Sequence, residues 1–439
     1  MAASVPGARP EEGDQAGGVR INRRAVEALR AGVPSQYAVR ALGSAQPHVE
    51  ERFWQQLQSA PENLARGTQP AGLLIAGDFG AGKSHLLGYL QHLALQQGFV
   101  CSKVVISKET PLYDPTRLYR AALQTAIVPG RRGAALAEVA ASLEFGGSAY
   151  ADFYRWVHRP DSGLNSRFPA TVFLYERAND AEIHDRIVSL WSGDPLNVSE
   201  MRAWLRAHDA AATYKLERVS YKELALQRFI FAPRLMVGAG YAGWVLLIDE
   251  AELIARYSFM QRARSYAALA RWAGRLEGEA YPGLIVVFAI TSDFATAMLE
   301  ERNDAEAIPG KLRASGLDPE RLLASQAERG MRLIAREAIH LRTPDSLVIE
   351  HTKEQVRALH AGAYCWSPPP LESADDPALR MRQHIRQWIN EWDLLRDDPL
   401  YRPQTVIADL RLDYSEEPAL AVPPEGDTMP PEGDTAEAD

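Results

Sequence analysis

The sequence has little cysteine and no long apolar run. Its 439 residues include only Cys101 and Cys365, so no disulfide framework is expected and a reducing, cytoplasmic setting fits. The Cys/His spacing of a zinc site is also absent. No apolar run approaches the roughly 18 residues of a membrane helix, and the N-terminal residues lack the apolar core of a signal peptide. A membrane partner is therefore not expected.

An excess of basic charge is lacking as well. The formal net charge is −9, but residues 415–439 hold eight acidic residues and no Lys or Arg, so the rest of the chain is nearly neutral. The basic residues are mostly Arg, which favours bidentate phosphate contacts but follows equally from the base composition of a genome. No basic stripe predicts nucleic-acid binding from charge alone.

What the chain does contain is one complete phosphate-loop pattern. An apolar run at 73–76 precedes it and a segment with helical spacing follows it, which is the strand, loop and helix order that this motif requires. Glycines let backbone N–H groups approach a phosphate, and the helix start adds the positive end of its dipole. We predict that the loop binds ATP, with Lys83 reaching the β- and γ-phosphates and Ser84 holding Mg²⁺; an accidental glycine-rich turn is the alternative. The predicted nucleotide-binding residues are Gly77, Asp78, Phe79, Gly80, Ala81, Gly82, Lys83, Ser84 and His85.

A second apolar run, residues 244–248, ends in two carboxylates, Asp249 and Glu250. This pattern predicts a buried parallel strand whose carboxyl end faces the ligand crevice. Asp249 would bind Mg²⁺, directly or through water, and Glu250 would orient and polarise an attacking water. We expect Glu252 to be an ordinary surface or helix-start residue.

A third apolar run, residues 283–290, ends in Thr291, Ser292 and Asp293. A polar side chain at this point would lie between the two acids and the γ-phosphate, so Thr291 and Ser292 are candidates for a sensing role in catalysis. Ser292 or Asp293 would equally serve as the N-cap of a helix that starts at Phe294. Both interpretations can hold together.

The chain divides into six predicted parts. Residues 127–240 are too long for a simple crossover between strands, and their pattern indicates a mostly helical insertion in which 171–175 fits a strand or a helix. A helix is predicted near 46–59, where it would either cover the nucleotide base or only pack against the rest of the protein. Residues 337–344 are predicted to form the last strand. The parts are a disordered N-terminus (1–20), with order beginning near Ile21; N-terminal helices and the first part of an ATPase core (21–126); the insertion (127–240); the second part of the core (241–345); a helical lid (346–414); and an acidic disordered tail (415–439).

This order of motifs resembles the AAA+ class of P-loop ATPases, most of all its origin-recognition branch. In addition, four longer segments resemble the BREX-system ATP-binding proteins of bacterial antiphage defence. These segments are GDFGAGKSHLL, VVISKETPLYDPTRLYRAAL, LLIDEAELIARYS and INRRAVEALRAGVPSQYAVRALG. The resemblance implies an α/β, AAA+-like fold with a parallel central sheet, ATP and Mg²⁺ as cofactors, and partners in a defence complex, with DNA as a further partner. Lys83, Ser84, Asp249 and Glu250 match the nucleotide motifs position by position, whereas the AAA+ sensor asparagine has no counterpart at Thr291-Ser292.

The resemblance leaves two functions open. One is an ATP-hydrolysing switch or motor that forms a homo-oligomer, in which a neighbour's arginine completes the site; Glu250 favours it. The other is a slow or non-hydrolysing ATP-dependent scaffold, which the lack of a sensor asparagine favours. A third interpretation, a kinase of a small substrate, fits the sequence less well. Candidates are Arg302 and Arg313 for the arginine finger and Arg382 or Arg386 for a lid arginine, although most surface arginines on helices are simply solvated.

Overall fold

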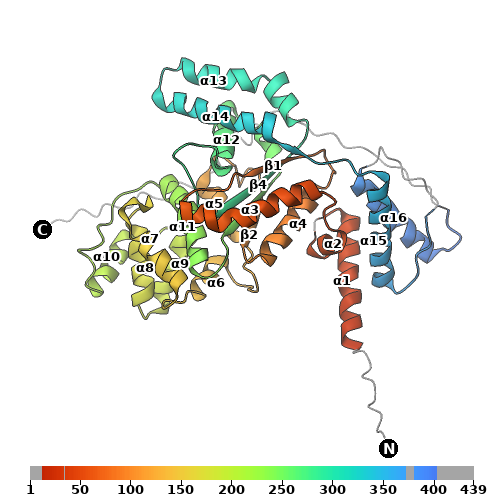
Figure 1. The fold of residues 1–439 in the computed structure, drawn as a ribbon, viewed down its shortest axis with the longest axis horizontal. Coiled ribbons are helices and arrows are strands. Elements are labelled where there is room, and N and C mark those ends of the chain that lie inside the picture. Colours follow the sequence, from red (N-terminus) through yellow and green to blue (C-terminus); the bar gives the residue numbers. More distant parts are fainter. Residues whose placement is uncertain (1–11, 34, 372–379, 403–439) are drawn as a thin grey trace, which may run out of the picture.

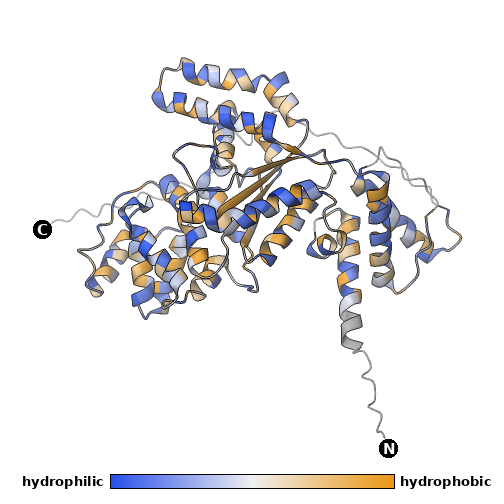
Figure 2. Ribbon diagram, in the orientation of Figure 1, coloured by the Kyte–Doolittle hydropathy of each residue, from blue (hydrophilic) through white to orange (hydrophobic). Residues whose placement is uncertain are grey.

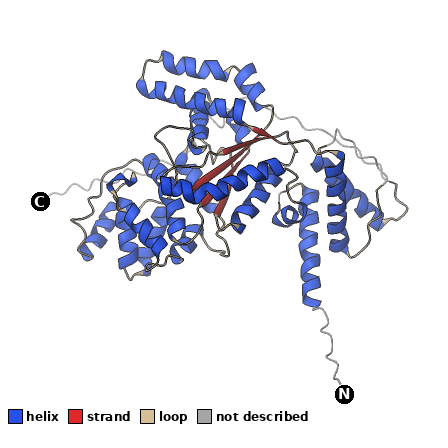
Figure 3. Cartoon of the chain, in the orientation of Figure 1, coloured by secondary structure: helices blue, strands red, loops and turns tan. Residues whose placement is uncertain are grey.

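The computed structural model describes residues 12–33, 35–371 and 380–402. In this part of the chain, one five-stranded sheet lies among many helices (Figure 3). Every pair of neighbouring strands is parallel, which confirms the predicted α/β class with a parallel central sheet. The strands are β1 (Leu73–Ala76), β2 (Val100–Val105), β3 (Trp244–Asp249), β4 (Leu284–Ile290) and β5 (Ile339–His340).

The strand order is β2-β3-β4-β1-β5. Because parallel strands all end at the same edge of a sheet, the segments that follow β1, β3 and β4 are neighbours there. Strands β3 and β4 are buried along their whole length, as expected for strands that are apolar on both faces. The sheet accordingly appears as the apolar centre of the molecule in Figure 2. This edge is where the predicted site residues can meet.

One face of the sheet is covered by α3 (Pro47–Arg66) and α4 (Lys83–Gln96). Alternate strand residues such as Ile75, Leu247 and Val287 form one apolar cluster with these helices. Helix α3 contributes Val49, Phe53, Leu57 and Ala60 to this cluster. The helix near residues 46–59 is therefore a packing helix on the sheet.

The opposite face carries the insertion (Figure 1). Residues 171–175 belong to a helix rather than to a strand: the Thr171 hydroxyl donates to the carbonyl of Arg167, 2.8 Å away and one turn earlier, although threonine is β-branched. Pro115 is the first residue of its helix, as predicted.

The helices between β2 and β3 are α5 (Pro115–Gln124), α6 (Ala135–Ala141), α7 (Ser148–Val157), η1 (Pro160–Ser162), α8 (Arg167–Arg177), α9 (Ala181–Ser192), α10 (Val198–Ala207) and α11 (Tyr221–Gly238). After β3 come η2 (Ala251–Arg256) and α12 (Phe259–Trp272).

Between β4 and β5 the chain forms η3 (Ala295–Glu301), α13 (Asp304–Ala314) and α14 (Asp318–Glu337). The last two make a hairpin that lies at the top of Figure 1. The predicted last strand, 337–344, was too long at both ends, because α14 continues to Glu337 and β5 has only two residues. Among the strands that the structure describes, β5 lies at the edge of the sheet beside β1, and the chain then leaves the sheet.

Both ends of the described chain meet in a helical lobe beside the sheet. Its helices are α1 (Glu12–Ala31), α2 (Gln36–Leu42), α15 (Ser346–Tyr364) and α16 (Met381–Asp397). Val26, Trp388 and Trp392 are fully or almost fully buried in their shared apolar cluster. None of the helices in the described ranges has the length and apolar character to span a membrane.

The N-terminus differs from its predicted boundary. Order was expected to begin near Ile21, yet α1 begins at Glu12. Adding residues to an existing helix needs no new nucleus, so the segment is helical despite Gly17 and Gly18, each of which costs about 1 kcal/mol relative to alanine. Residues 1–11 and the predicted acidic tail, 415–439, lie outside the described ranges.

Candidate functional site

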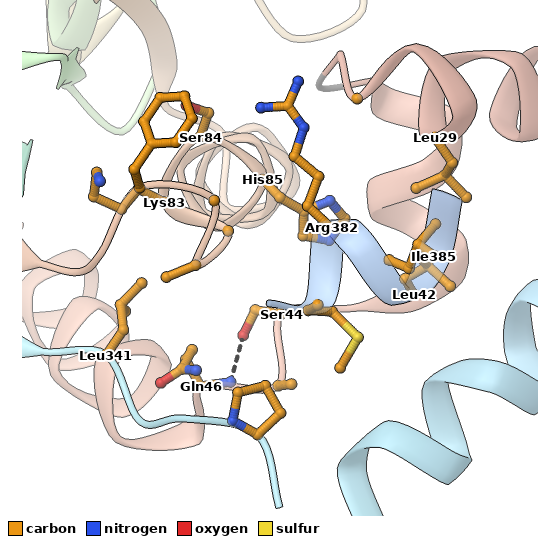
Figure 4. A pocket seen from close by; sticks show the side chains of 18 of the residues that line it. Leu29, Leu42, Ser44, Gln46, Lys83, Ser84, His85, Leu341, Arg382 and Ile385 are labelled. Carbon is orange, nitrogen blue, oxygen red and sulfur yellow. Dashed lines mark hydrogen bonds between the residues drawn. The ribbon is translucent and has the colours of Figure 1, made fainter. Parts of the chain in front are cut away.

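A cavity of about 350 Å³ lies where the glycine loop meets the helical lobe. Figure 4 shows Lys83 and Ser84 on one side of it and Leu29, Leu42 and Ile385 on the other. The cavity thus has a polar phosphate end and an apolar end. The phosphate end comprises residues 79–85 with Asp249, Glu250 and Glu252, and the apolar end comprises Ala28, Leu29, Val33, Leu42, Met381 and Ile385.

The glycine loop has the backbone that its sequence requires. Gly80 and Gly82 have φ values of +82° and +94°, which glycine adopts without steric cost. Gly82, which lines the cavity, is the N-cap of α4 and has no side chain with which to cap it, so the first amides of α4 lie at the cavity edge. The loop can therefore offer backbone donors to an anion.

Lys83 lies inside this loop with 8% of its surface exposed. Its ammonium group donates to the carbonyls of Gly77 and Asp78, at 2.7 and 3.1 Å. Burial lowers the pKa of Lys83, and the charge of Glu252 is the first of several that oppose this shift. The side chain is thus a buried cation at the edge of the cavity, and its ammonium group is held by carbonyls of its own loop.

Asp249 ends β3 and is 3% exposed. Its Oδ1 accepts the N–H of Glu250 at 3.1 Å, and its Oδ2 lies 3.3 Å from the ammonium group of Lys103. Lys103 also donates to the main-chain carbonyl of Ser84 at 3.0 Å. Lys103 was not among the residues predicted from the sequence, although a single lysine within a mostly apolar strand was an available signal.

Glu252 corrects a sequence prediction. It was expected to be a surface or helix-start residue. It does lie in the first turn of η2, but it is 7% exposed and lines the phosphate end of the cavity. Glu250 adopts a left-handed conformation (φ +57°), and η2 follows at once, so the chain turns out of the strand and Glu252 enters the site. Its Oε2 atom has no hydrogen-bond partner among the described residues. Burial raises the pKa of Glu252 to about 7, and it also raises the pKa of the more exposed Glu250.

Thr291 and Ser292 follow β4, between β1 and β3. Thr291 is 2% exposed, and the hydroxyl of Ser292 donates to the carboxylate of Asp78 in the glycine loop. Neither residue lines the cavity. The expected N-cap at Ser292 or Asp293 was wrong, because the following turn is a π-helix with Phe294 as its N-cap.

Of the four candidate arginines, Arg382 lines the cavity. It packs over Gly32 at the end of α1, where any side chain would collide with its guanidinium group. Arg386 instead donates to the carbonyl of Arg30, outside the cavity lining. Arg302 donates to the carbonyl of Ala255, and Arg313 pairs with Glu328 on the exposed hairpin, at 3.0 and 2.6 Å.

His85 connects α4 to the lobe. Its Nε2 lies 2.6 Å from the carbonyl of Gly43, which follows α2, so the imidazole must carry its proton on Nε2. Burial lowers the pKa of His85, which favours this neutral form. The residue after the glycine loop thus fixes the polar end of the cavity to the apolar end.

The donor set fits a metal that arrives with a nucleotide. Within the described ranges, no three His, Cys, Asp or Glu side chains are grouped so that they could hold a metal ion. Ser84 and Asp249 would supply only part of the octahedral oxygen shell of Mg²⁺, which characteristically takes its other ligands from phosphates and water. Ser84 and Asp249 are therefore suited to bind Mg²⁺ together with a triphosphate.

A parallel sheet with a glycine loop after β1 and carboxylates after β3 is compatible with a P-loop nucleoside-triphosphate-binding protein. The chain belongs to the BREX system ATP-binding protein family: the model of the BREX system ATP-binding proteins BrxC/D matches residues 19–143 and 219–364. This match confirms the resemblance seen in the sequence. The helices α7 to α10 lie between the two matched segments. No curated protein and no solved structure matches the chain.

Proposed function

We propose that the protein binds and hydrolyses ATP with Mg²⁺, as an AAA+-like switch or motor in a BREX-type antiphage defence complex. Family membership supports ATP and the defence setting. The observation that carries the proposal is the cavity that brings Lys83 and Ser84 together with Asp249 and Glu250, although more than 160 residues separate the two pairs.

The phosphates of ATP would bind at the start of α4, where the loop amides and the helix dipole favour an anion. Lys83 would exchange its contacts with the carbonyls of Gly77 and Asp78 for the β- and γ-phosphates. Mg²⁺ held by Ser84 and Asp249 would neutralise phosphate charge. The base would lie at the apolar end of the cavity, between α1 and α16.

Glu250 would accept a hydrogen bond from the attacking water. It is the more exposed of the two glutamates at the cavity, and its raised pKa makes the carboxylate a better proton acceptor. Arg382 would act as the lid arginine, since it already lines the cavity. In a homo-oligomer, Arg313 is the better finger candidate, because it is exposed and its partner Glu328 is also partly exposed, whereas Arg302 is half-buried and donates to the main-chain carbonyl of Ala255. Contact with DNA is part of the proposal on family membership alone.

A slow ATP-dependent scaffold is the second candidate. Ser292 follows the strand between β1 and β3, where a sensing side chain is expected, but its hydroxyl is engaged by Asp78. In this alternative, ATP would order the lobe and its partner surface without rapid turnover.

The experiment compares wild type with Glu250→Gln. Phosphate release is measured with and without DNA, ATP binding by calorimetry, and oligomer size by light scattering with and without ATP. We expect the variant to bind ATP and to release phosphate about 100-fold more slowly, because it lacks the proton acceptor. Equally slow release from both proteins, with assembly still dependent on ATP, would support the scaffold. Absence of ATP binding in both would overturn both functions.

A further inference from the structure

Lys103 is a buried cation that the nucleotide motifs leave unexplained. It lies on β2 and pairs in register with Leu247, two residues before Asp249 on β3. Residues two apart on a strand face the same way, so Lys103 and Asp249 share the face of the sheet that α4 covers. The side chain of Lys103 is 20% exposed and that of Asp249 is 5% exposed. The pair is therefore largely removed from water.

The ammonium group of Lys103 joins the two residues that would hold Mg²⁺. It donates to the main-chain carbonyl of Ser84 at 3.0 Å, and it lies 3.3 Å from Oδ2 of Asp249. Because the contact with Ser84 uses the main chain, it leaves the serine hydroxyl for the metal. Asp249 Oδ1 accepts the N–H of Glu250, so Oδ2 is the oxygen whose charge Lys103 balances.

We propose that Lys103 is an internal counter-cation that competes with the divalent ion for Asp249 and thereby limits how strongly ATP binding depends on Mg²⁺. This inference rests on the proposed function and adds a regulatory residue to its site. In this role the positive charge of Lys103 sets the Mg²⁺ dependence of ATP binding, and the side chain does more than hold Asp249 in place.

Two electrostatic effects lead to the same expectation. A positive charge in a poorly hydrated site attracts the triphosphate and repels a divalent ion that approaches the same carboxylate. Removing the charge from Lys103 would weaken the binding of metal-free ATP and would leave Asp249 with a charge for Mg²⁺ to balance. If Lys103 only oriented Asp249, its loss would instead reduce the benefit that Mg²⁺ brings. The two roles therefore predict changes of opposite sign.

The experiment measures the Kd of a fluorescent ATP analogue in EDTA and in excess Mg²⁺. The measured quantity is the ratio of the Kd without Mg²⁺ to the Kd with it. We expect Lys103→Met to raise this ratio about tenfold, whereas Lys103→Arg, which keeps the charge, stays near wild type. Lys222→Met, which removes an exposed lysine near the start of α11, should leave the ratio unchanged.

Circular dichroism and thermal melting establish that each variant is folded. If Lys103→Met is not, Lys103→Gln also removes the charge but keeps a hydrogen-bond donor, and the same tenfold rise is expected. A ratio that stays the same or falls in a folded, uncharged variant overturns the inference while leaving the proposed function intact. Failure of wild type to bind the analogue in either condition overturns the proposed function, and the inference with it.

Discussion

The two ends of the cavity are encoded in different ways. The phosphate end comes from consecutive residues, 79–85, and from three carboxylates within four residues, whereas the apolar end brings Ala28 together with Ile385. Two residues of the glycine loop, Gly80 and Gly82, meet a local backbone requirement, a positive φ. The apolar end depends on helices from both ends of the chain and has no local signature. The residue types of the phosphate end thus follow local sequence patterns, whereas the apolar end is formed by tertiary packing.

The largest effect that would test this comparison is expected at Lys83. In Lys83→Ala, the phosphate end loses the buried ammonium group that would bind the β- and γ-phosphates. Charge-assisted hydrogen bonds of this kind are worth up to about 3 kcal/mol, so we expect ATP affinity to fall about 100-fold by calorimetry. Lys222→Ala is the matched control. Affinity close to wild type in a folded Lys83→Ala protein would show that the loop is not the phosphate site.

A smaller effect is expected at the apolar end. Ala28 lines the cavity on α1, and Ala28→Phe would place an aromatic ring in the space assigned to the base. We expect the KM for ATP to rise about tenfold, by loss of binding energy that does not differ between ground and transition states. The kcat should change little, in contrast to the Glu250→Gln variant.

Ala207→Phe, at the exposed end of α10, controls for an added ring outside the cavity. A fall in kcat with unchanged KM in Ala28→Phe would contradict the assignment of the base to the apolar end of the cavity.

The sequence predicted those parts of the fold that a local pattern determines. The buried runs of β3 and β4, Pro115 at the start of α5 and the strand–loop–helix around Lys83 were all read correctly. Thr171 shows the limit of prediction from a local pattern. The segment around this β-branched residue fits a strand as well as a helix, and only the tertiary structure places it in α8. The enclosure of the cavity by α1 could not be predicted, because it depends on packing against α15 and α16.

The same distinction holds within the site. Glu252 could not be placed from the sequence, since its burial follows from the left-handed conformation of Glu250, which few non-glycine residues adopt. Lys103 reaches Asp249 only because β2 and β3 are neighbours in a particular register. Residue types were visible in both cases, but the geometry that gives them a role was not.

The last effect concerns the stability of the fold rather than nucleotide binding, and it is expected at Glu252. The folded protein raises its pKa from 4.5 to about 7, chiefly because the charged form is poorly hydrated. Between these pH values the folded chain binds more protons than the unfolded chain, so this residue makes stability fall as pH rises. Glu252→Gln removes the titration. In denaturant unfolding, we expect the variant to exceed wild type by about 3 kcal/mol at pH 8 and by less than about 1 kcal/mol at pH 5.

Glu300→Gln, at an exposed position of η3, should match wild type at both pH values. A second variant links this effect to the phosphate end: Lys83 lowers the pKa of Glu252, so in a Lys83→Ala background the gain from Glu252→Gln at pH 8 should be larger. The same gain in both backgrounds would mean that Glu252 and Lys83 do not share one electrostatic environment. A larger gain would show that the carboxylate missed by the sequence pattern belongs to the same site as the lysine that the pattern identifies.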